Sequence, residues 1–218
     1  MNKTENRQTF LARLQGHFSQ NDIDLIELAY DLSKEAHRTQ KRDRGGRYFE
    51  HPRSGCLIMM DELGLYDRDL IIGFLFHDVG EDTPLLGNRV NSYEEFVQKA
   101  KFRLTKLFGE KVADTVIRLT KPEVDDIKFF SKEESLDFYH DEMLKSEEAI
   151  FGKELDRLHN LRTLLGSGYK SPKIAKTVKE TEEVYLPIFE SIQGPLKKYS
   201  EILVQKIKLE LENLKASL

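Results

Sequence analysis

Apolar residues recur at intervals of three and four along most of this chain, which is the spacing of one buried helix face. Alternating patterns typical of strands are scarce, and glycine and proline stand mainly between the periodic segments. The clearest series are Leu25, Leu28, Leu32 and Ala36; Phe96, Ala100, Leu104 and Leu107; Val112, Val116 and Leu119; and Ile174, Val178, Val184, Ile188 and Ile192. The pattern predicts an all-α protein.

The continuous apolar run at residues 70–76 fits either a buried strand or a helix that is buried on all sides. The helix is favoured because the neighbouring segments are helical and because Asp67 or Asp69 can cap its start. A further helix is expected from about Leu144 to Leu164.

The last segment carries one apolar stripe on a helix whose other positions are mostly Lys and Glu. The stripe consists of Leu196, Tyr199, Leu203, Ile207, Leu211, Leu214 and Leu218. It predicts either a helix packed on the chain's own core, which is favoured, or a helix through which the chain forms a homo-oligomer, and the pattern does not separate the two. We expect an N-terminal helical extension at 1–20, one domain at 21–193 and this helix at 194–218.

Length and composition narrow the class of protein. A chain of 218 residues with 39% hydrophobic and 33% charged residues suits one soluble domain. The net charge of −4 argues against a nucleic-acid partner, and the apolar runs fall far short of the ~20 residues that span a membrane. The N-terminus is polar, unlike a secretory signal, and Cys56 is the only cysteine, so we expect a cytoplasmic protein without a disulfide.

Three short stretches concentrate residues with ligand chemistry: His51-Pro52, residues 77–82 and residues 156–160. Each has an ordinary explanation when taken singly. A histidine before proline suits the start of a helix, three carboxylates after an apolar run suit a solvated helix end, and a histidine within a helix is most often structural. If the helix that begins near residue 70 continues, His77 and Glu81 lie on one face.

Together the stretches supply two imidazoles and two carboxylates, from His51, His77, Asp78 and Asp156. Such a mixed nitrogen and oxygen shell suits Mn²⁺, Fe²⁺ or another divalent ion, which lowers the pKa of a water and neutralises a phosphoryl oxygen. Glu81 or Asp82, beside the ion, could orient that water or take its proton.

These motifs, in this order, resemble the HD superfamily of metal-dependent phosphohydrolases. More narrowly, they resemble the (p)ppGpp hydrolase domain of the RelA/SpoT family and its small stand-alone, Mesh1-like relatives. The likeness is carried by residues 36–42 (AHRTQKR), 48–52 (YFEHP), 76–83 (FHDVGEDT), 155–164 (LDRLHNLRTL) and, more weakly, 180–187 (ETEEVYLP). The resemblance implies a single-domain helical bundle of HD type with the metal site in its core.

The resemblance also implies roles for ten residues. His51, His77, Asp78 and Asp156 would hold the metal, usually Mn²⁺, and Glu81 and Asp82 would be the catalytic acidic pair. Arg42, Asn160, Thr163 and Tyr185 match positions that line the nucleotide pocket. The implied reaction removes the 3′-pyrophosphate of ppGpp or pppGpp to give GDP or GTP and pyrophosphate, so the implied partner is a small-molecule nucleotide.

Local charge supports an anionic substrate. Residues 38–47 contain five basic side chains and one acid, Asp43, although we assign most of them to a solvated turn and expect only Arg42 to bind the substrate. Three departures from the family pattern stand out: Asp43 where a second basic residue is expected, the composition of residues 122–135, and Glu154 where a small residue is expected.

Two other functions remain open at this point. The chain could be an HD phosphatase for another nucleotide such as NADPH, or a nucleotide sensor without turnover. A helical interaction protein would leave the acidic and histidine clusters unexplained. Kinases, GTPases and dehydrogenases are disfavoured because no glycine-rich phosphate loop or dinucleotide fingerprint is present.

Overall fold

The computed structural model describes residues 5–42, 45–87, 90–124, 127–164, 168 and 171–218. The α-helices of this described part are α1 (Arg7–Ala12), α2 (Gln20–Ala36), α3 (Glu50–Leu57), α4 (Arg68–Phe76), α5 (Val79–Asp82), α6 (Tyr93–Phe108), α7 (Glu110–Leu119), α8 (Lys132–Met143), α9 (Glu147–Leu164), α10 (Ser171–Glu180), α11 (Leu186–Phe189) and α12 (Lys197–Ala216). Short elements are η1 (Ile58–Glu62), η2 (Pro84–Leu86), η3 (Thr181–Tyr185), β1 (Glu123–Val124) and β2 (Ile127–Lys128).

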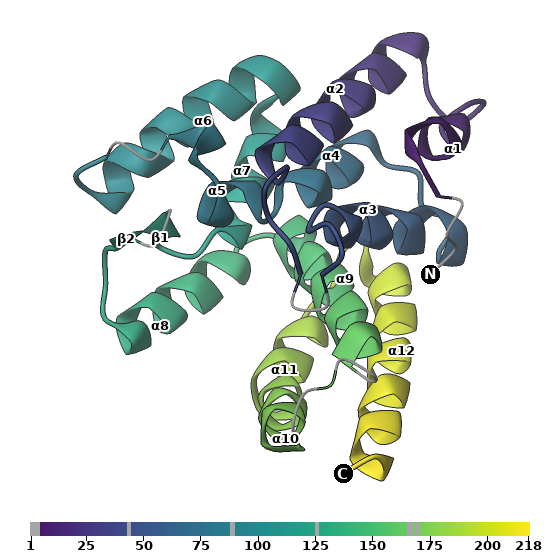
Figure 1. The fold of residues 1–218 in the computed structure, drawn as a ribbon, viewed down its shortest axis with the longest axis vertical. Helices are drawn as coiled ribbons and strands as arrows, with labels where there is room; N and C mark the ends of the chain where they lie inside the picture. The colour runs from purple at the N-terminus through teal and green to yellow at the C-terminus, as the bar shows by residue number, and fades with distance from the viewer. Residues whose placement is uncertain (1–4, 43–44, 88–89, 125–126, 165–167, 169–170) are drawn as a thin grey trace.

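Helix α9 is the centre of the fold (Figure 1). It packs against α3, α4, α7, α8, α11 and α12, and buried side chains occur on most of its turns. Helices α2, α4, α6 and α7 form the upper part of the view in Figure 1, while α10, α11 and α12 extend below them. The predicted all-α class is confirmed. None of the described helices combines the length and the apolar character that crossing a membrane requires.

The run at residues 70–76 is the buried helix α4, as its flanks predicted. Asp67 caps it, because its side chain accepts hydrogen bonds from the backbone nitrogens of Asp69 and Leu70 at 2.9 and 3.0 Å. Helix α3 packs tightly on α4 at Gly55, where an added Cβ would lie 1.9 Å from the Phe74 ring. This close approach brings the start of α3 beside the end of α4.

The helix does not continue through residues 77–82, so the condition under which His77 and Glu81 would share one helix face is not met. Helix α4 ends at Phe76, and the single turn α5 begins at Val79. Gly80 of this turn packs on the helices behind it, since a Cβ there would meet Thr120 Oγ1 at 2.7 Å. The break therefore turns Glu81 away from His77.

The segment at residues 122–135 contains a feature that the sequence patterns did not predict. Strands β1 and β2 pair antiparallel, with Glu123 opposite Lys128 and Val124 opposite Ile127. Helix α8 follows, with a capping box between Ser131 and Glu134. Asp43, the other departure near the basic segment, lies outside the described residues.

The C-terminal stripe packs within the chain. Leu203, Ile207, Leu211 and Leu214 are buried, and α12 contacts α9, α10 and α11.

Glu154 lies in the contact between α9 and α12. It is fully buried and accepts a hydrogen bond from the hydroxyl of Ser200. Burial raises the pKa of the Glu154 carboxyl to about 8, and the bond from Ser200 offsets only part of this effect. The glutamate that departs from the family pattern is thus a buried group that prefers to be neutral.

Glu154→Gln is expected to stabilise the chain at pH 9 relative to the wild type and to change its stability little at pH 4. With a folded-state pKa near 8 against an ordinary 4.5, the stability that Glu154 contributes is fully present below pH 4.5 and is lost as the pH rises through 8. At about 1.4 kcal/mol per pH unit, the gain at pH 9 reaches at most roughly 5 kcal/mol.

Urea unfolding at pH 4, 7 and 9 measures this difference, with Glu201→Gln as the control because Glu201 is exposed on α12. A difference between Glu154→Gln and the wild type that does not grow with pH would contradict the prediction.

Candidate metal centre

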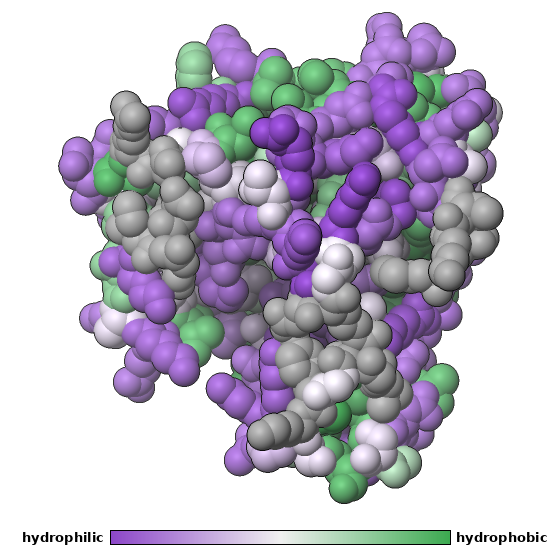
Figure 2. All heavy atoms as spheres, in the orientation of Figure 1, coloured by the Kyte–Doolittle hydropathy of each residue, from purple (hydrophilic) through white to green (hydrophobic). Residues whose placement is uncertain are grey.

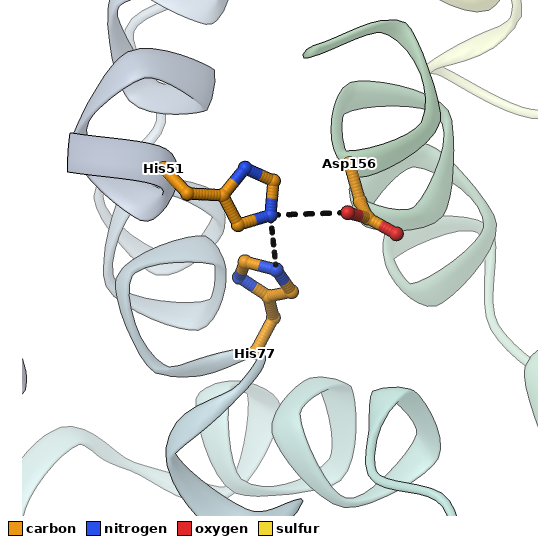
Figure 3. Close-up of side chains that lie close together, drawn as sticks. All are labelled: His51, His77 and Asp156. Atoms are coloured by element: carbon orange, nitrogen blue, oxygen red, sulfur yellow. Dashed lines mark hydrogen bonds and ion pairs between the residues drawn. The ribbon is translucent and has the colours of Figure 1, made fainter. Parts of the chain in front are cut away.

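Three segments that are distant in the sequence meet at the cluster drawn in Figure 3. His51 lies in the first turn of α3, His77 follows α4, Asp78 precedes α5, and Asp156 lies in the middle of α9. His51, His77 and Asp156 are buried. The tight packing of α3 on α4 and the contact of both helices with α9 hold these side chains together.

The ligand atoms of His51, His77 and Asp156 lie within 4.8 Å of one another. His51 Nε2 is 3.0 Å from Asp156 Oδ1 and 3.3 Å from His77 Nε2. Asp78 Oδ2 is 3.0 Å from His77 Nε2 and 3.6 Å from His51 Nε2. The structure thus brings together all four predicted ligands.

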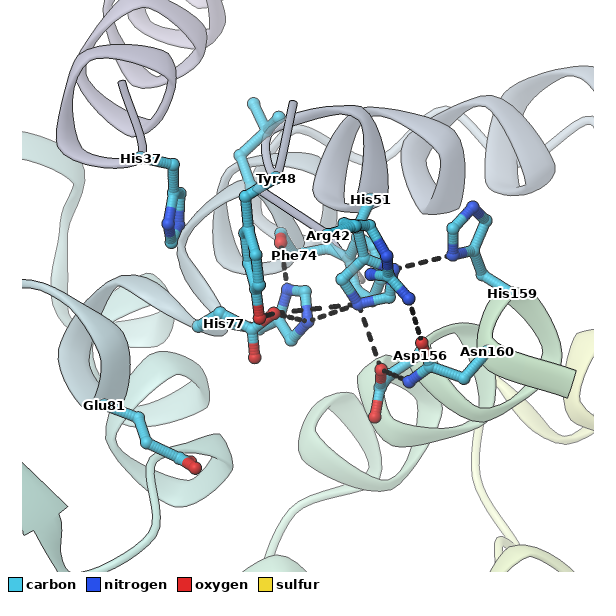
Figure 4. A network of polar contacts seen from close by, with 12 residues as sticks. His37, Arg42, Tyr48, His51, Phe74, His77, Glu81, Asp156, His159 and Asn160 are labelled. Carbon is cyan, nitrogen blue, oxygen red and sulfur yellow. Dashed lines mark hydrogen bonds and ion pairs between the residues drawn. The ribbon is translucent and has the colours of Figure 1, made fainter. Parts of the chain in front are cut away.

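In both histidines the outer ring nitrogen, Nδ1, has a hydrogen-bond partner outside the cluster. This bond fixes the orientation of the ring, so the inner nitrogen, Nε2, points into the cluster. His77 Nδ1 lies 2.7 Å from the Phe74 carbonyl oxygen, which can only accept, so Nδ1 carries the hydrogen and Nε2 presents a lone pair to the cluster. His51 Nδ1 lies 2.7 Å from His159 Nδ1, and one of these two nitrogens donates to the other (Figure 4). The inner nitrogens of His51 and His77 lie 3.3 Å apart, and each lies 3.0 Å from a carboxylate oxygen, so the donor set fits a metal ion.

The charges at the cluster favour a cation as well. Burial disfavours the charged form of His77, but the adjacent Asp78 carboxylate outweighs it, so the pKa of His77 is raised. Burial also opposes the ionisation of Asp156, yet Lys153 and His51 hold the pKa of this carboxyl well below its usual range. Both effects favour ionised carboxylates in the cluster, and these carboxylates attract positive charge.

Tyr48 positions Asp78, a role that the sequence patterns did not reveal. Its hydroxyl donates a hydrogen bond to Asp78 Oδ2 at 2.9 Å. Burial and the Asp78 charge raise the pKa of Tyr48, so the hydroxyl remains a donor. The available signal was its place three residues before His51 in the same motif.

A chain of hydrogen bonds connects Asp156 to the basic loop. Asn160 Nδ2 donates to Asp156 Oδ1 at 2.5 Å, and Arg42 Nη2 donates to Asn160 Oδ1 at 2.8 Å (Figure 4). The Thr163 hydroxyl donates to the carbonyl oxygens of His159 and Asn160 one turn earlier. Three of the four predicted nucleotide-pocket residues therefore lie on one side of the metal cluster.

Glu81 and Asp82 occupy different environments. Glu81 Oε1 forms an ion pair with Lys121 Nζ at 2.7 Å, and Figure 4 shows it apart from the histidines. Burial and the neighbouring Asp78 charge raise the pKa of Asp82 to about 6. Asp82 is thus a carboxyl that can exchange a proton near neutral pH.

A cavity of about 490 Å³ opens onto this cluster. It is lined by eight of the ten predicted residues, all except His77 and Tyr185. His77 is buried, and Tyr185 lies against Arg157, whose guanidinium is 4.0 Å from the ring centroid. The face of the molecule in Figure 2 is largely hydrophilic across its middle.

The cavity also contains basic residues that the sequence patterns did not assign to it. Among its described lining residues, six are cationic: Lys41, Arg42, Arg47, Lys121, Lys153 and Arg157. Five are acidic: Glu50, Asp78, Glu81, Asp82 and Asp156. The lining thus has a formal net charge of +1, and a divalent ion would raise it to +3, which suits a polyanion. The sequence offered a signal for Lys153, which lies one helical turn before Asp156 and therefore on the same helix face. No local sequence signal marks Lys121 as a residue of the cavity.

The fold and the site define the class: an all-α protein of HD type with a buried cluster of histidine and aspartate that fits a metal ion. No family model matches the chain. It is 35% identical over 181 residues to guanosine-3′,5′-bis(diphosphate) 3′-pyrophosphohydrolase of Aquifex aeolicus. The aligned region covers 82% of this chain and 23% of that protein. It is 29% identical over 205 residues to the bifunctional (p)ppGpp synthase/hydrolase SpoT of Escherichia coli, with 92% and 25% covered.

The chain therefore spans about a quarter of the length of these curated relatives. The fold matches a solved structure described as a metazoan ortholog of SpoT that hydrolyses ppGpp, with a TM-score of 0.62, 21% identity, and coverage of 88% of this chain and 94% of the other. The resemblance to RelA/SpoT-type (p)ppGpp hydrolases is thus confirmed: over most of its length the chain is a homologue of the ppGpp 3′-pyrophosphohydrolases.

Asp156→Ala and His77→Ala are each expected to weaken Mn²⁺ binding by more than about a hundredfold, because loss of a ligand costs more than loss of its outer partner. Metal analysis after dialysis and calorimetric titration with Mn²⁺ measure the effect. Asp137→Ala, an exposed aspartate of α8, is the matched control. Retention of wild-type Mn²⁺ affinity in either site variant would remove that residue from the ligand set.

Proposed function

We propose that this chain is a metal-dependent hydrolase that removes the 3′-pyrophosphate of ppGpp or pppGpp, giving GDP or GTP and pyrophosphate. One observation carries the proposal: a single cavity joins the histidine and aspartate cluster, the pair Glu81 and Asp82, and six cationic side chains. The names of the curated relatives support the same reaction. A nucleotide substrate of this kind implies a cytoplasmic enzyme.

His51, His77, Asp78 and Asp156 would hold the ion, for which we propose Mn²⁺ because the shell mixes imidazole with carboxylate. When bound, such an ion lowers the pKa of a water and neutralises charge on a phosphoryl oxygen. Tyr48 and Asn160 keep the carboxylates of Asp78 and Asp156 aimed at the cluster.

Asp82 is proposed as the group that takes the proton of the attacking water. The water oxygen bonds to the phosphorus that carries the 3′ oxygen, and the bond between this phosphorus and O3′ breaks. O3′ keeps the electron pair and takes a proton from solvent, to which Asp82 returns the proton of the attacking water. The pyrophosphoryl group leaves with the water oxygen as pyrophosphate. Glu81, fixed by Lys121, is proposed to orient the water beside Asp82.

Arg42, Asn160 and Thr163 are proposed to hold the nucleoside end of the substrate, since all three line the cavity beside Asp156. For Tyr185 we propose a supporting role, because its ring lies against Arg157 and Lys153, both of which line the cavity.

The purified chain with Mn²⁺ is expected to convert ppGpp to GDP and pyrophosphate, and chelation of the metal is expected to abolish turnover. Assaying ppGpp and NADPH side by side separates the two substrate classes, because the first releases pyrophosphate and the second orthophosphate. Orthophosphate released from NADPH without pyrophosphate released from ppGpp would assign the chain to the other phosphatase class. Binding of ppGpp without turnover would make it a sensor.

Asp82→Asn is expected to lower kcat by about 10²–10⁴-fold while Mn²⁺ binding is retained, because the amide cannot accept the proton. In the wild type the pKa of Asp82 is raised to about 6, so this carboxyl is protonated at lower pH. Activity should therefore fall about tenfold per pH unit below the pKa of Asp82, which bound Mn²⁺ shifts to below 6 because it neutralises the Asp78 charge, and the residual activity of the variant should lack this dependence. Loss of Mn²⁺ from Asp82→Asn would instead make Asp82 a ligand.

A further inference from the structure

Two side chains of the segment at residues 36–42 have no part in the reaction proposed above, although a hydrogen bond connects them to Asp82. His37 follows α2 and is 1% exposed, and its Nδ1 lies 2.5 Å from Gln40 Oε1. Gln40 Nε2 lies 2.6 Å from the backbone carbonyl oxygen of Asp82. A chain of two hydrogen bonds thus joins the end of α2 to the backbone of the proposed proton acceptor.

The chemistry of the partners fixes the direction of both hydrogen bonds. A carbonyl oxygen can only accept, so the amide nitrogen of Gln40 faces Asp82 and donates. The amide oxygen of Gln40 then faces His37, and therefore the hydrogen of the neutral imidazole is on Nδ1. His37 Nε2 is buried without a hydrogen-bond partner among the described residues, and burial lowers the pKa of His37, so the ring stays neutral.

The carbonyl group that Gln40 contacts needs a donor from outside its own helix. Helix α5 is a single turn and Thr83 after it is extended, so the last carbonyl oxygens of α5 have no partner in a following turn. The Asp82 N–H donates to the Asp78 carbonyl oxygen at 2.9 Å. With Gln40 on its carbonyl oxygen, the backbone of Asp82 is held at both ends.

The ring of His37 has a second contact, with Tyr48. The two rings stack with their centroids 4.7 Å apart and an angle of 25° between their planes, and Figure 4 shows them side by side. The Tyr48 hydroxyl in turn donates to Asp78. His37 therefore contacts one neighbour of each acidic residue, Gln40 beside Asp82 and Tyr48 beside Asp78.

We propose that His37 and Gln40 are positioning residues for the reaction: the imidazole orients the Gln40 amide, and the amide holds the α5 turn so that the Asp82 carboxyl reaches the attacking water. This assignment rests on the proposed function. A proton acceptor works only within hydrogen-bond reach of the proton that it takes, and a misplacement of about 1 Å can cost ~10²-fold in rate. Gln40 contacts the backbone of Asp82, so it acts through position and exchanges no proton itself.

Two substitutions separate the links of this chain. Gln40→Met tests the amide, because methionine has a similar length and forms neither hydrogen bond. His37→Phe keeps a ring against Tyr48 and removes the donor to Gln40. Gln98→Met is the matched control, because Gln98 is exposed on α6. Turnover of ppGpp with Mn²⁺, Mn²⁺ binding and urea unfolding are measured for each variant.

Gln40→Met is expected to lower kcat about 10- to 100-fold and to change KM and Mn²⁺ affinity by less than about twofold. His37→Phe should lower kcat less, and should add no further loss to Gln40→Met because both act through one hydrogen-bond chain. In a protein that already carries Asp82→Asn, Gln40→Met should lower kcat by less than about twofold, because the carboxyl that it positions is absent. An unchanged kcat in Gln40→Met, or a loss of equal size with and without Asp82→Asn, would overturn the positioning role.

Amide hydrogen exchange at Asp82, followed by NMR without substrate, tests the support of α5 independently of turnover. The Asp82 N–H is bonded within the turn, so it exchanges faster when the turn opens. Its exchange is expected to be about five- to tenfold faster in Gln40→Met, which lacks one hydrogen bond to the turn, and unchanged in Gln98→Met. Faster exchange in a chain that does not hydrolyse ppGpp would reject the proposed function and retain Gln40 as the support of α5. Wild-type exchange in Gln40→Met would overturn the inference.

Discussion

The structure depends on one costly arrangement, in which two imidazole rings and two carboxylates face one another where α3, α4 and α9 meet. Burial opposes both charged histidine and charged carboxylate, and each group is held by a partner outside the cluster. The Phe74 carbonyl and His159 form hydrogen bonds with the outer nitrogens of the two histidines. Tyr48, Asn160 and Lys153 form hydrogen bonds with the two carboxylates. The fold thus supplies a site whose remaining lone pairs a divalent cation satisfies.

The break between α4 and α5 gives the two acidic positions after His77 separate tasks. A continuous helix would have placed His77 and Glu81 on one face. In the structure Glu81 turns to Lys121, and Asp82 stays near Asp78 in a buried setting that raises its pKa to about 6. One carboxylate is neutralised by a cation, and the other is ready to exchange a proton near neutral pH.

Positive charge in an acidic protein is concentrated here by tertiary contacts. The net charge of the chain is −4, yet cationic side chains from three segments line one cavity. The loop before α3 supplies one group, and the end of α7 and the helix α9 supply the other. Because α9 also contributes Asp156, the same helix fixes the metal cluster and part of the anion-binding surface.

Sequence by itself determined the helical class, the capped and buried helix at residues 70–76, and the four residues of the metal cluster, because these follow from local periodicity and from ligand chemistry in short motifs. Only the tertiary structure decided that α4 stops at Phe76, that Lys121 pairs with Glu81, and that Tyr185 lies behind Arg157. Helical periodicity tells which face of a segment is buried, but not which charge it meets across the core. Those pairings depend on the packing of α3, α4, α7 and α9, which brings the metal-cluster residues and the cationic side chains to one cavity.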